Sequence, residues 1–282
     1  MKVLAPGKLV LTGAYAVLEG APAVVAAIDR YAVADTGEPE RVDTSSMRDE
    51  GGRKLGLGSS AAWRVAAEGA REAAGGADLR DVAVRARIFD AVRAAHARDQ
   101  GGGSGVDVAA AVHGGVVRYV LDGARANARR APLPQGVELA AFFSGESART
   151  SDLRARVEAL KARDRHALAR LCDVALEADA AVVSGAALDF VRAARAFGAA
   201  LARLGESADA PIVPPAFSEL ASLAARDGGA FLPSGAGGGD VGVWLSLAPP
   251  PVSFVARARS LAMRPLSLCI DPDGVRVDST SR

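Results

Sequence analysis

The chain has 282 residues, half of them hydrophobic, so it can bury a large core without disulfides. This composition excludes a collagen-like chain, a small disulfide framework and a wholly disordered chain. The 34 basic and 33 acidic residues leave a net charge of +1, too balanced for the electrostatic footprint of a nucleic-acid-binding protein. Any anionic ligand must therefore be bound by local groups.

The cysteines and the N-terminus predict a cytoplasmic protein. Cys172 and Cys269 lie far apart in no metal-ligand spacing, so we expect two reduced thiols that act as small core residues. No uncharged apolar run of about 18 residues occurs, and no secretion signal precedes Pro6. The sequence thus predicts no membrane partner.

Hydrophobic periodicity and turn residues predict an α+β order of elements with no internal repeat. In the first half we predict strands over 3–5, 9–11 and 23–34, an exposed polar loop over 35–53, helices over 59–74 and 79–98, a short helix from Val106, and strands over 116–121 and 137–143. In the second half we predict a helical run over 151–204 with one helix beginning near Arg165, helices over 217–226 and 254–263, and strands over 241–247 and 266–270.

A glycine-rich segment, GLGSSAA at 56–62, lies immediately before a predicted helix. Free backbone N–H groups and the positive end of the helix dipole make such a position an anion site, and glycine lets a phosphate approach the backbone. The segment matches neither the Walker pattern nor the dinucleotide-binding fingerprint. A structural turn at the helix entry remains the alternative, because glycine and serine are common there.

A second segment, PSGAGGGD at 233–240, separates a predicted helix from a predicted strand. A hairpin or linker is the structural alternative, but a flexible linker seldom lies between two apolar elements of one domain. Close approach of the backbone to a ligand explains the glycines better.

These two segments, together with APGKLVLTGAYAVLEG at 5–20, resemble in their order the three motifs of the GHMP small-molecule kinases. Within that family, HARDQG at 96–101, GSGVDVA at 103–109 and SARTSDL at 147–153 are similar to segments of the branch that phosphorylates mevalonate 5-phosphate. The resemblance covers most of the chain.

The resemblance implies the α+β GHMP kinase fold in two regions. Residues 1–135 would form the ATP-binding region, with a left-handed βαβ crossover, and residues 136–282 a ferredoxin-like region on the substrate side. It also implies transfer of the γ-phosphoryl group of ATP, with Mg²⁺, to the phosphate of mevalonate 5-phosphate. The product would be mevalonate 5-diphosphate, a precursor in isoprenoid synthesis.

The same resemblance assigns roles to individual residues. Lys8 and Asp107 would be catalytic, and Ser60 would be a ligand of Mg²⁺. The residues that would bind ATP are Lys54, Gly56, Leu57, Gly58, Ser59, Ser60 and Ala61. The residues that would bind the acceptor are Tyr15, Ser104, Gly105, Ser147, Arg149, Thr150, Ser151, Gly235, Ala236 and Gly237.

Several of these residues also have a purely structural explanation. Lys8 and Lys54 are compatible with solvated surface lysines, and Asp107 with a first-turn aspartate that interacts with a helix dipole. The hydroxyls at 147, 150 and 151 are compatible with helix caps. Arg149 among them favours phosphate binding, because a guanidinium can bind two phosphate oxygens at once.

Other classes of enzyme are disfavoured or remain open. His96, His113 and His166 are too scattered for a zinc site, and Ser59 and Ser60 do not lie in a nucleophile-elbow pattern. Three alternatives remain: a GHMP kinase that phosphorylates an alcohol such as mevalonate or homoserine, an ATP-consuming decarboxylase of the same architecture, and a non-catalytic nucleotide-binding module. We expect small-molecule partners and a monomer or homodimer.

Overall fold

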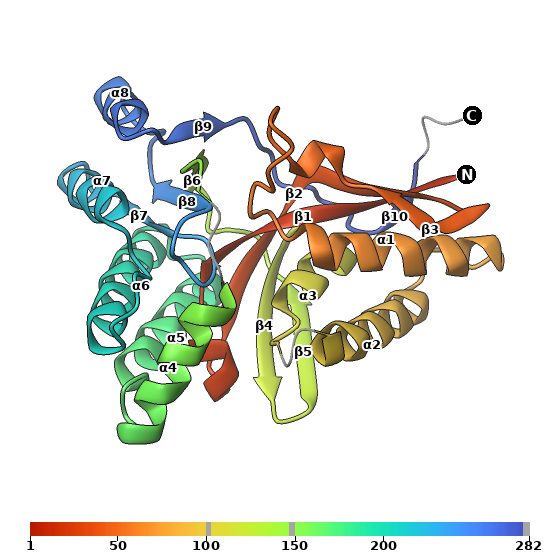
Figure 1. The fold of residues 1–282 in the computed structure, drawn as a ribbon, viewed down its shortest axis with the longest axis horizontal. Coiled ribbons are helices and arrows are strands. Elements are labelled where there is room, and N and C mark those ends of the chain that lie inside the picture. The colour runs from red at the N-terminus through yellow and green to blue at the C-terminus, as the bar shows by residue number, and fades with distance from the viewer. Residues whose placement is uncertain (100–102, 147–149, 279–282) are drawn as a thin grey trace.

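The computed structural model describes residues 1–99, 103–146 and 150–278, which form two antiparallel sheets covered by helices (Figure 1). The predicted mixed α+β fold is confirmed. In the first sheet the strand order is β10-β1-β2-β4-β5, and β3 also pairs with β2. Its strands are β1 (Lys2–Thr12), β2 (Ala23–Asp35), β3 (Glu38–Asp43), β4 (Val116–Asp122), β5 (Arg125–Arg130) and β10 (Arg276–Val277).

The central strand β1 is one continuous element, so the prediction of two separate strands was wrong. The register against β2 shifts between Pro6 and Gly7, and this irregularity accommodates a proline that has no N–H to donate. β2 likewise continues through Asp29 and Arg30. Residues 5–12 of β1 are all buried, which means that both faces of the strand are covered.

The polar segment 35–53 is more ordered than the predicted exposed loop. It contains β3, which pairs with β2, and a short 3-10 helix, η2 (Ser45–Met47). β3 is an edge strand and is mostly exposed. Exposed edge strands carry polar residues, so the composition of β3 resembles that of a loop. The side chain of Met47 is fully buried and anchors the segment.

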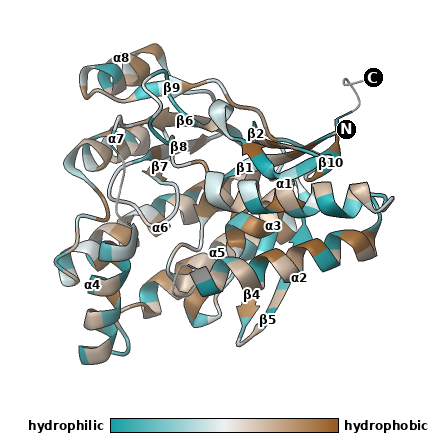
Figure 2. Cartoon of the chain, turned by 45° about the vertical axis from the view of Figure 1, so that its right-hand side comes forward, coloured by the Kyte–Doolittle hydropathy of each residue, from teal (hydrophilic) through white to brown (hydrophobic). Residues whose placement is uncertain are grey.

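Helices α1 (Ser59–Ala74) and α3 (Val106–His113) pack against the first sheet, and α2 (Val82–Asp99) packs against α1 and α3 (Figure 1). α1 has the predicted bounds. Its buried face consists of small residues such as Ala62, Ala66 and Gly69, and a Cβ at Gly69 would lie 2.9 Å from Val275. Figure 2 shows polar and apolar residues alternating along α1, the pattern of a helix covered on one side.

The second sheet has the strand order β7-β8-β6-β9 and an aromatic core. Phe254 packs edge-on against Trp244 at 4.6 Å between ring centroids and against Phe142 and Phe231 at 5.5 Å. The strands are β6 (Glu138–Phe143), β7 (Ala230–Pro233), β8 (Val241–Ser246) and β9 (Arg264–Leu266). The helices of this half are α4 (Thr150–Arg163), α5 (Ala169–Ser184), α6 (Ala187–Ser207), α7 (Pro215–Arg226) and α8 (Val252–Ser260).

The two halves share a continuous hydrophobic core and are also joined by a charged pair. The Arg118 guanidinium on β4 donates two 2.6 Å hydrogen bonds to the Asp179 carboxylate on α5. No helix in the described ranges has the length and apolar character needed to cross a membrane.

Both cysteines carry free thiols, as expected, but only Cys172 is partly buried. Cys269 is exposed, which corrects its prediction as a core residue. It lies in an extended segment after β9 whose backbone pairs with Asp29, so its polar main chain, rather than its thiol, makes the contact.

His113, the last residue of α3, makes stability depend on pH. Burial, reinforced by the nearby Arg85 and Arg130, lowers the pKa of His113 from 6.5 to about 4, although a helix C-terminus ordinarily favours the protonated form. Between these values the unfolded chain binds a proton that the folded protein excludes, so stability falls as the pH falls from about 6.5 to about 4.

We expect urea unfolding to show a loss on the order of 2 kcal/mol between pH 7 and pH 5 from this residue. His113→Gln is expected to flatten that part of the pH dependence, whereas His166→Gln, at an exposed position, serves as the matched control. An unchanged pH profile in His113→Gln contradicts the assignment.

Candidate functional site

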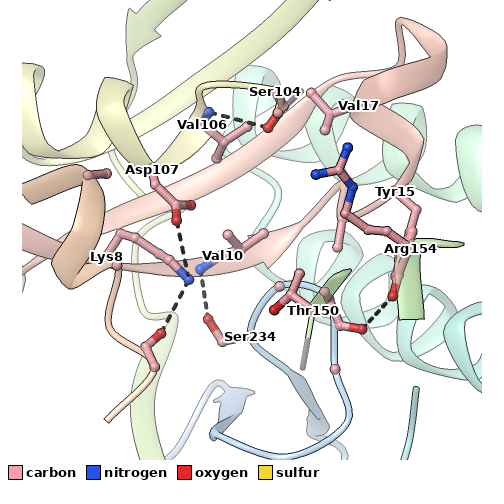
Figure 3. A pocket seen from close by; sticks show the side chains of 18 of the residues that line it. Lys8, Val10, Tyr15, Val17, Ser104, Val106, Asp107, Thr150, Arg154 and Ser234 are labelled. Atoms are coloured by element: carbon pink, nitrogen blue, oxygen red, sulfur yellow. Dashed lines mark hydrogen bonds and ion pairs between the residues drawn. The ribbon is translucent and has the colours of Figure 1, made fainter. Parts of the chain in front are cut away.

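A cavity of about 850 Å³ lies where β1, α1, α3, α4 and the glycine loop after β7 meet (Figure 3). Its volume is in the range of sites that hold a cofactor or substrate. The elements that form it come from both ends of the sequence, since α1 and α3 belong to the first half and the loop 234–240 to the second.

Lys8 lies where the turn 56–58, the first turn of α3 and the loop 234–240 meet. Its ammonium Nζ donates a 3.4 Å hydrogen bond to the carbonyl of Gly56 and lies 4.0 Å from Oδ2 of Asp107. A Cβ at Gly235 would lie 3.7 Å from the same Nζ. The Lys8 side chain is only 9% exposed, so it is not the solvated surface lysine of the structural alternative.

The turn 56–58 brings the N-terminus of α1 to the cavity. Gly56 and Gly58 have φ values of +74° and +77°, and the N-cap Gly58 offers no side chain to cap the helix. The backbone N–H groups of the first turn are therefore available to an anion. Ser59, Ser60 and Ala61 of this turn line the cavity.

Gly58→Val is expected to weaken ATP binding at least tenfold, as measured by calorimetric titration. A Cβ at Gly58 would lie 2.8 Å from Cγ of Lys8, and a β-branched residue at this φ costs about 1 to 2 kcal/mol. Gly76→Val is the matched control, because Gly76 has φ +84° with no neighbour within 4 Å of the added Cβ. Unchanged ATP affinity in folded Gly58→Val removes this turn from the site.

Asp107 lies in the first turn of α3, after Gly105 at φ +84°. Its carboxylate faces Lys8 across the cavity (Figure 3) and is 36% exposed. The position is compatible with the helix dipole, but the approach to Lys8 is an additional contact that a merely structural aspartate does not need.

The loop 234–240 closes the opposite side of the cavity and is held at several points. The backbone N–H of Val10 donates to Oγ of Ser234 at 2.9 Å, and the Tyr15 hydroxyl donates to the carbonyl of Ala236 at 2.7 Å. A Cβ at Gly237 would lie 2.0 Å from the carbonyl oxygen of Ile212, so only glycine fits there.

Nearly all of the predicted site residues line this one cavity. Leu57 does not, because its side chain is buried beneath the turn while its carbonyl accepts a 2.9 Å hydrogen bond from the Lys8 backbone. Ser147 and Arg149 lie outside the described residues. Those that line the cavity are Lys8, Tyr15, Lys54, Gly56, Gly58, Ser59, Ser60, Ala61, Ser104, Gly105, Asp107, Thr150, Ser151, Gly235, Ala236 and Gly237.

Four titratable side chains that line the cavity were not predicted as site residues: His96, Arg154, Glu158 and Asp240. Arg154 lies one turn after Thr150 and Ser151 on α4, and helical spacing places all three on one face, so periodicity could have indicated it. In Figure 3 its guanidinium extends toward Ser104 and Val17. His96 near the end of α2 is 8% exposed; it begins the family-like segment 96–101, but the sequence assigned it no role.

The oxygen donors present suit a magnesium ion that arrives with ATP. The Ser60 hydroxyl and the Asp107 carboxylate both line the cavity. Mg²⁺ in such sites takes one or two protein oxygens and obtains its other ligands from phosphates and water. The donor set therefore fits the predicted cofactor.

The chain is similar to known proteins in sequence and in fold. No family model matches the chain. Over 229 residues it is 34% identical to a phosphomevalonate kinase of Streptomyces sp. (strain CL190), and the matched part covers 72% of this chain and 60% of that protein. The chain therefore spans less than two thirds of the length of this relative.

Solved structures show the same fold at lower identity. A Listeria innocua protein is 21% identical with a TM-score of 0.85, covering 99% of both chains. A Streptococcus pneumoniae phosphomevalonate kinase in complex with phosphomevalonate and AMPPNP is 18% identical with a TM-score of 0.78, covering 96% of this chain and 99% of that one. A mevalonate kinase of L. major is 17% identical with a TM-score of 0.71, covering 96% of each chain.

The chain thus has the fold of the phosphomevalonate and mevalonate kinases, which is the fold that its resemblance to the GHMP small-molecule kinases predicted. Its sequence is similar to that of a phosphomevalonate kinase, as the resemblance predicted.

Proposed function

We propose that the protein transfers the γ-phosphoryl group of ATP to the phosphate of mevalonate 5-phosphate, giving mevalonate 5-diphosphate and ADP. The observation that carries the proposal is the position of the Lys8 ammonium, in contact with the Gly56 carbonyl, near Asp107 and beside Gly235. Phosphoryl transfer requires such a charge where donor and acceptor meet. The similarity to phosphomevalonate kinase supports the choice of acceptor.

In this mechanism the first turn of α1 binds the β- and γ-phosphates of ATP through its backbone N–H groups. Bound Mg²⁺ would neutralise phosphate charge, held by Ser60 and Asp107. An oxygen of the acceptor phosphate attacks the γ-phosphorus, the bond to the bridging β–γ oxygen breaks, and ADP leaves. Lys8 stabilises the negative charge on the transferred group.

Asp107 need not act as a strong base toward this acceptor. A phosphate monoester has a second pKa of about 6 and is largely deprotonated at neutral pH. The carboxylate instead positions Lys8 and the acceptor. An alcohol acceptor would instead require a group that accepts its proton. Asp107, whose carboxylate lies 4.0 Å from the Lys8 ammonium, could serve that purpose.

The two parts of the chain divide the work in this proposal. Residues 1–135 carry the turn 56–60, Lys8 and Asp107, and bind the nucleotide. Residues 136–282 carry α4 and the loop 234–240, and bind the acceptor. We propose that the protein acts on small molecules in the cytoplasm as a monomer or homodimer.

The decisive experiment supplies Mg-ATP with mevalonate, mevalonate 5-phosphate, mevalonate 5-diphosphate and homoserine in separate reactions, with the product mass measured for each. We expect a gain of one phosphoryl group on mevalonate 5-phosphate. Preference for an alcohol identifies an alcohol kinase, and release of carbon dioxide from the diphosphate identifies a decarboxylase. ATP binding without any product identifies a non-catalytic module. Each of these three results overturns the proposal.

Arg154 is expected to bind an anionic group of the acceptor. Charge-assisted hydrogen bonds contribute about 1.5 to 3 kcal/mol, so Arg154→Gln should raise KM for mevalonate 5-phosphate about tenfold or more and leave KM for ATP unchanged. Steady-state kinetics with each substrate varied separately measure both constants. The roles of Ser147 and Arg149 toward the acceptor remain predictions from the sequence.

Arg156→Gln is the matched control on the same helix, since Arg156 is exposed and lies 3.5 Å from the Asp209 carboxylate outside the cavity. An equal rise of KM in both variants, or a defect confined to ATP, contradicts the role of Arg154.

A further inference from the structure

The backbone at Tyr15 has a conformation that few residues other than glycine adopt. Its φ and ψ are 62° and −50°, and the N–H of Ala16 donates a 2.7 Å hydrogen bond to the carbonyl of Ala14. These features define a γ-turn with positive φ at its centre, which is rare and strained. Such strain persists only where the surrounding structure enforces it, and it concentrates at functional sites.

The turn gives the Tyr15 side chain a specific contact across the cavity. The residue is 7% exposed, and its hydroxyl donates a 2.7 Å hydrogen bond to the carbonyl of Ala236, 221 residues away in sequence (Figure 3). Burial raises the pKa of Tyr15 against the opposing influence of Arg154, so the hydroxyl remains a donor at neutral pH. The strained turn therefore directs a hydrogen-bond donor at the middle of the glycine loop.

The loop itself has little intrinsic preference for one shape. Gly235, Gly237, Gly238 and Gly239 all have positive φ, and glycine adopts positive and negative φ about equally readily. At one flank of the loop the Val10 N–H donates a hydrogen bond to Oγ of Ser234. At the other flank the N–H groups of Gly238 and Asp240 donate to the carbonyls of Ile212 and Glu146, at 2.8 and 2.9 Å. The Tyr15 hydroxyl holds the residue between these flanks.

The position of that residue affects the catalytic centre. Gly235, next to Ala236, faces the Lys8 ammonium: a Cβ added at Gly235 would lie 3.7 Å from Nζ. Movement of the loop would change the wall that faces Nζ, and catalytic groups must be held within a fraction of an ångström of their productive positions.

We propose that Tyr15 is a positioning residue: its hydroxyl fixes the loop 234–240 over the cavity and, through Gly235, fixes the Lys8 ammonium against the transferred phosphoryl group. The last step rests on the proposed function, whereas the restraint on the loop does not. This role differs from the direct contact with the acceptor that the sequence predicts for Tyr15.

Tyr15→Phe tests the proposal because it retains the ring and removes the hydroxyl. Tyr31→Phe is the matched control: the Tyr31 hydroxyl donates a 2.8 Å hydrogen bond to Asp271, far from the loop in sequence and not among the residues that line the cavity. Hydrogen exchange of peptides spanning 231–241 reports the loop through the amides of Gly238 and Asp240, and steady-state kinetics report the catalytic centre.

In Tyr15→Phe we expect exchange of this peptide about tenfold faster, kcat about tenfold lower and KM for ATP unchanged. In Tyr31→Phe we expect neither change, even if its melting temperature falls as much as that of Tyr15→Phe. Unchanged exchange in Tyr15→Phe overturns the proposal, and a higher KM for mevalonate 5-phosphate with unchanged exchange assigns Tyr15 to direct acceptor binding instead. If the wild-type protein phosphorylates no acceptor, the proposed function fails, while the exchange result still decides the restraint on the loop.

Discussion

Replacement of Lys8 by methionine is expected to lower kcat by a factor of about one hundred or more, a loss of roughly 3 kcal/mol of transition-state stabilisation. Methionine is also a long, flexible side chain, so the change removes mainly the charge. The ammonium lies between the Gly56 carbonyl and the Asp107 carboxylate, the position proposed for the transferred phosphoryl group.

Stability should change little in Lys8→Met. The side chain is 9% exposed, and removing a buried charge also removes its desolvation cost, which offsets the loss of a 4.0 Å ion pair. Kinetics and thermal unfolding of the same preparation separate the two effects. Lys2→Met is the matched control, because Lys2 is exposed at the beginning of the same strand. Wild-type kcat in Lys8→Met shows that this residue is not catalytic.

Asp107→Asn is expected to lower kcat for mevalonate 5-phosphate by about two orders of magnitude. Asparagine has the same shape but loses the charge that attracts the Lys8 ammonium and a candidate ligand of magnesium, so both positively charged partners are less well held. The loss of a favourable interaction with the α3 dipole should cost about 0.5 kcal/mol of stability. A large kinetic effect with a small stability effect is the expected result.

Single-turnover rates and urea unfolding measure these two quantities for Asp107→Asn. Asp90→Asn, at an exposed position on α2, is the matched control. A variant that turns over at the wild-type rate contradicts the catalytic role. A loss of stability large enough to explain the lower rate shows that the aspartate is structural.

The restraint on the glycine loop links these two residues to a third. The Tyr15 hydroxyl donates its hydrogen bond to Ala236, and Ala236 is the neighbour of Gly235, which faces the Lys8 ammonium. Because the loop is rich in glycine, its shape depends on contacts from other elements more than on its own sequence. Variants of Tyr15 and Lys8 should therefore show non-additive effects on kcat, since they act on one unit.

The sequence by itself determined the features that depend on local chemistry. The helix 59–74 begins and ends as predicted because its small residues recur at helical spacing and glycines bound it. The three glycine-rich motifs identified the cavity before any contact was known, since glycine is needed wherever a backbone must approach another group closely. The first of those motifs contains Lys8, and Asp107 lies in the further family-like segment 103–109.

Only the tertiary structure decided the features that depend on distant neighbours. β1 continues through Pro6 because its register against β2 shifts there, and β3 is a strand because it borders β2, although its polar composition resembles that of a loop. Arg154 faces the cavity only because α4 packs beside it. The strained turn at Tyr15 is held by a hydrogen bond to a residue 221 positions away, and local propensity contains no information about such a partner.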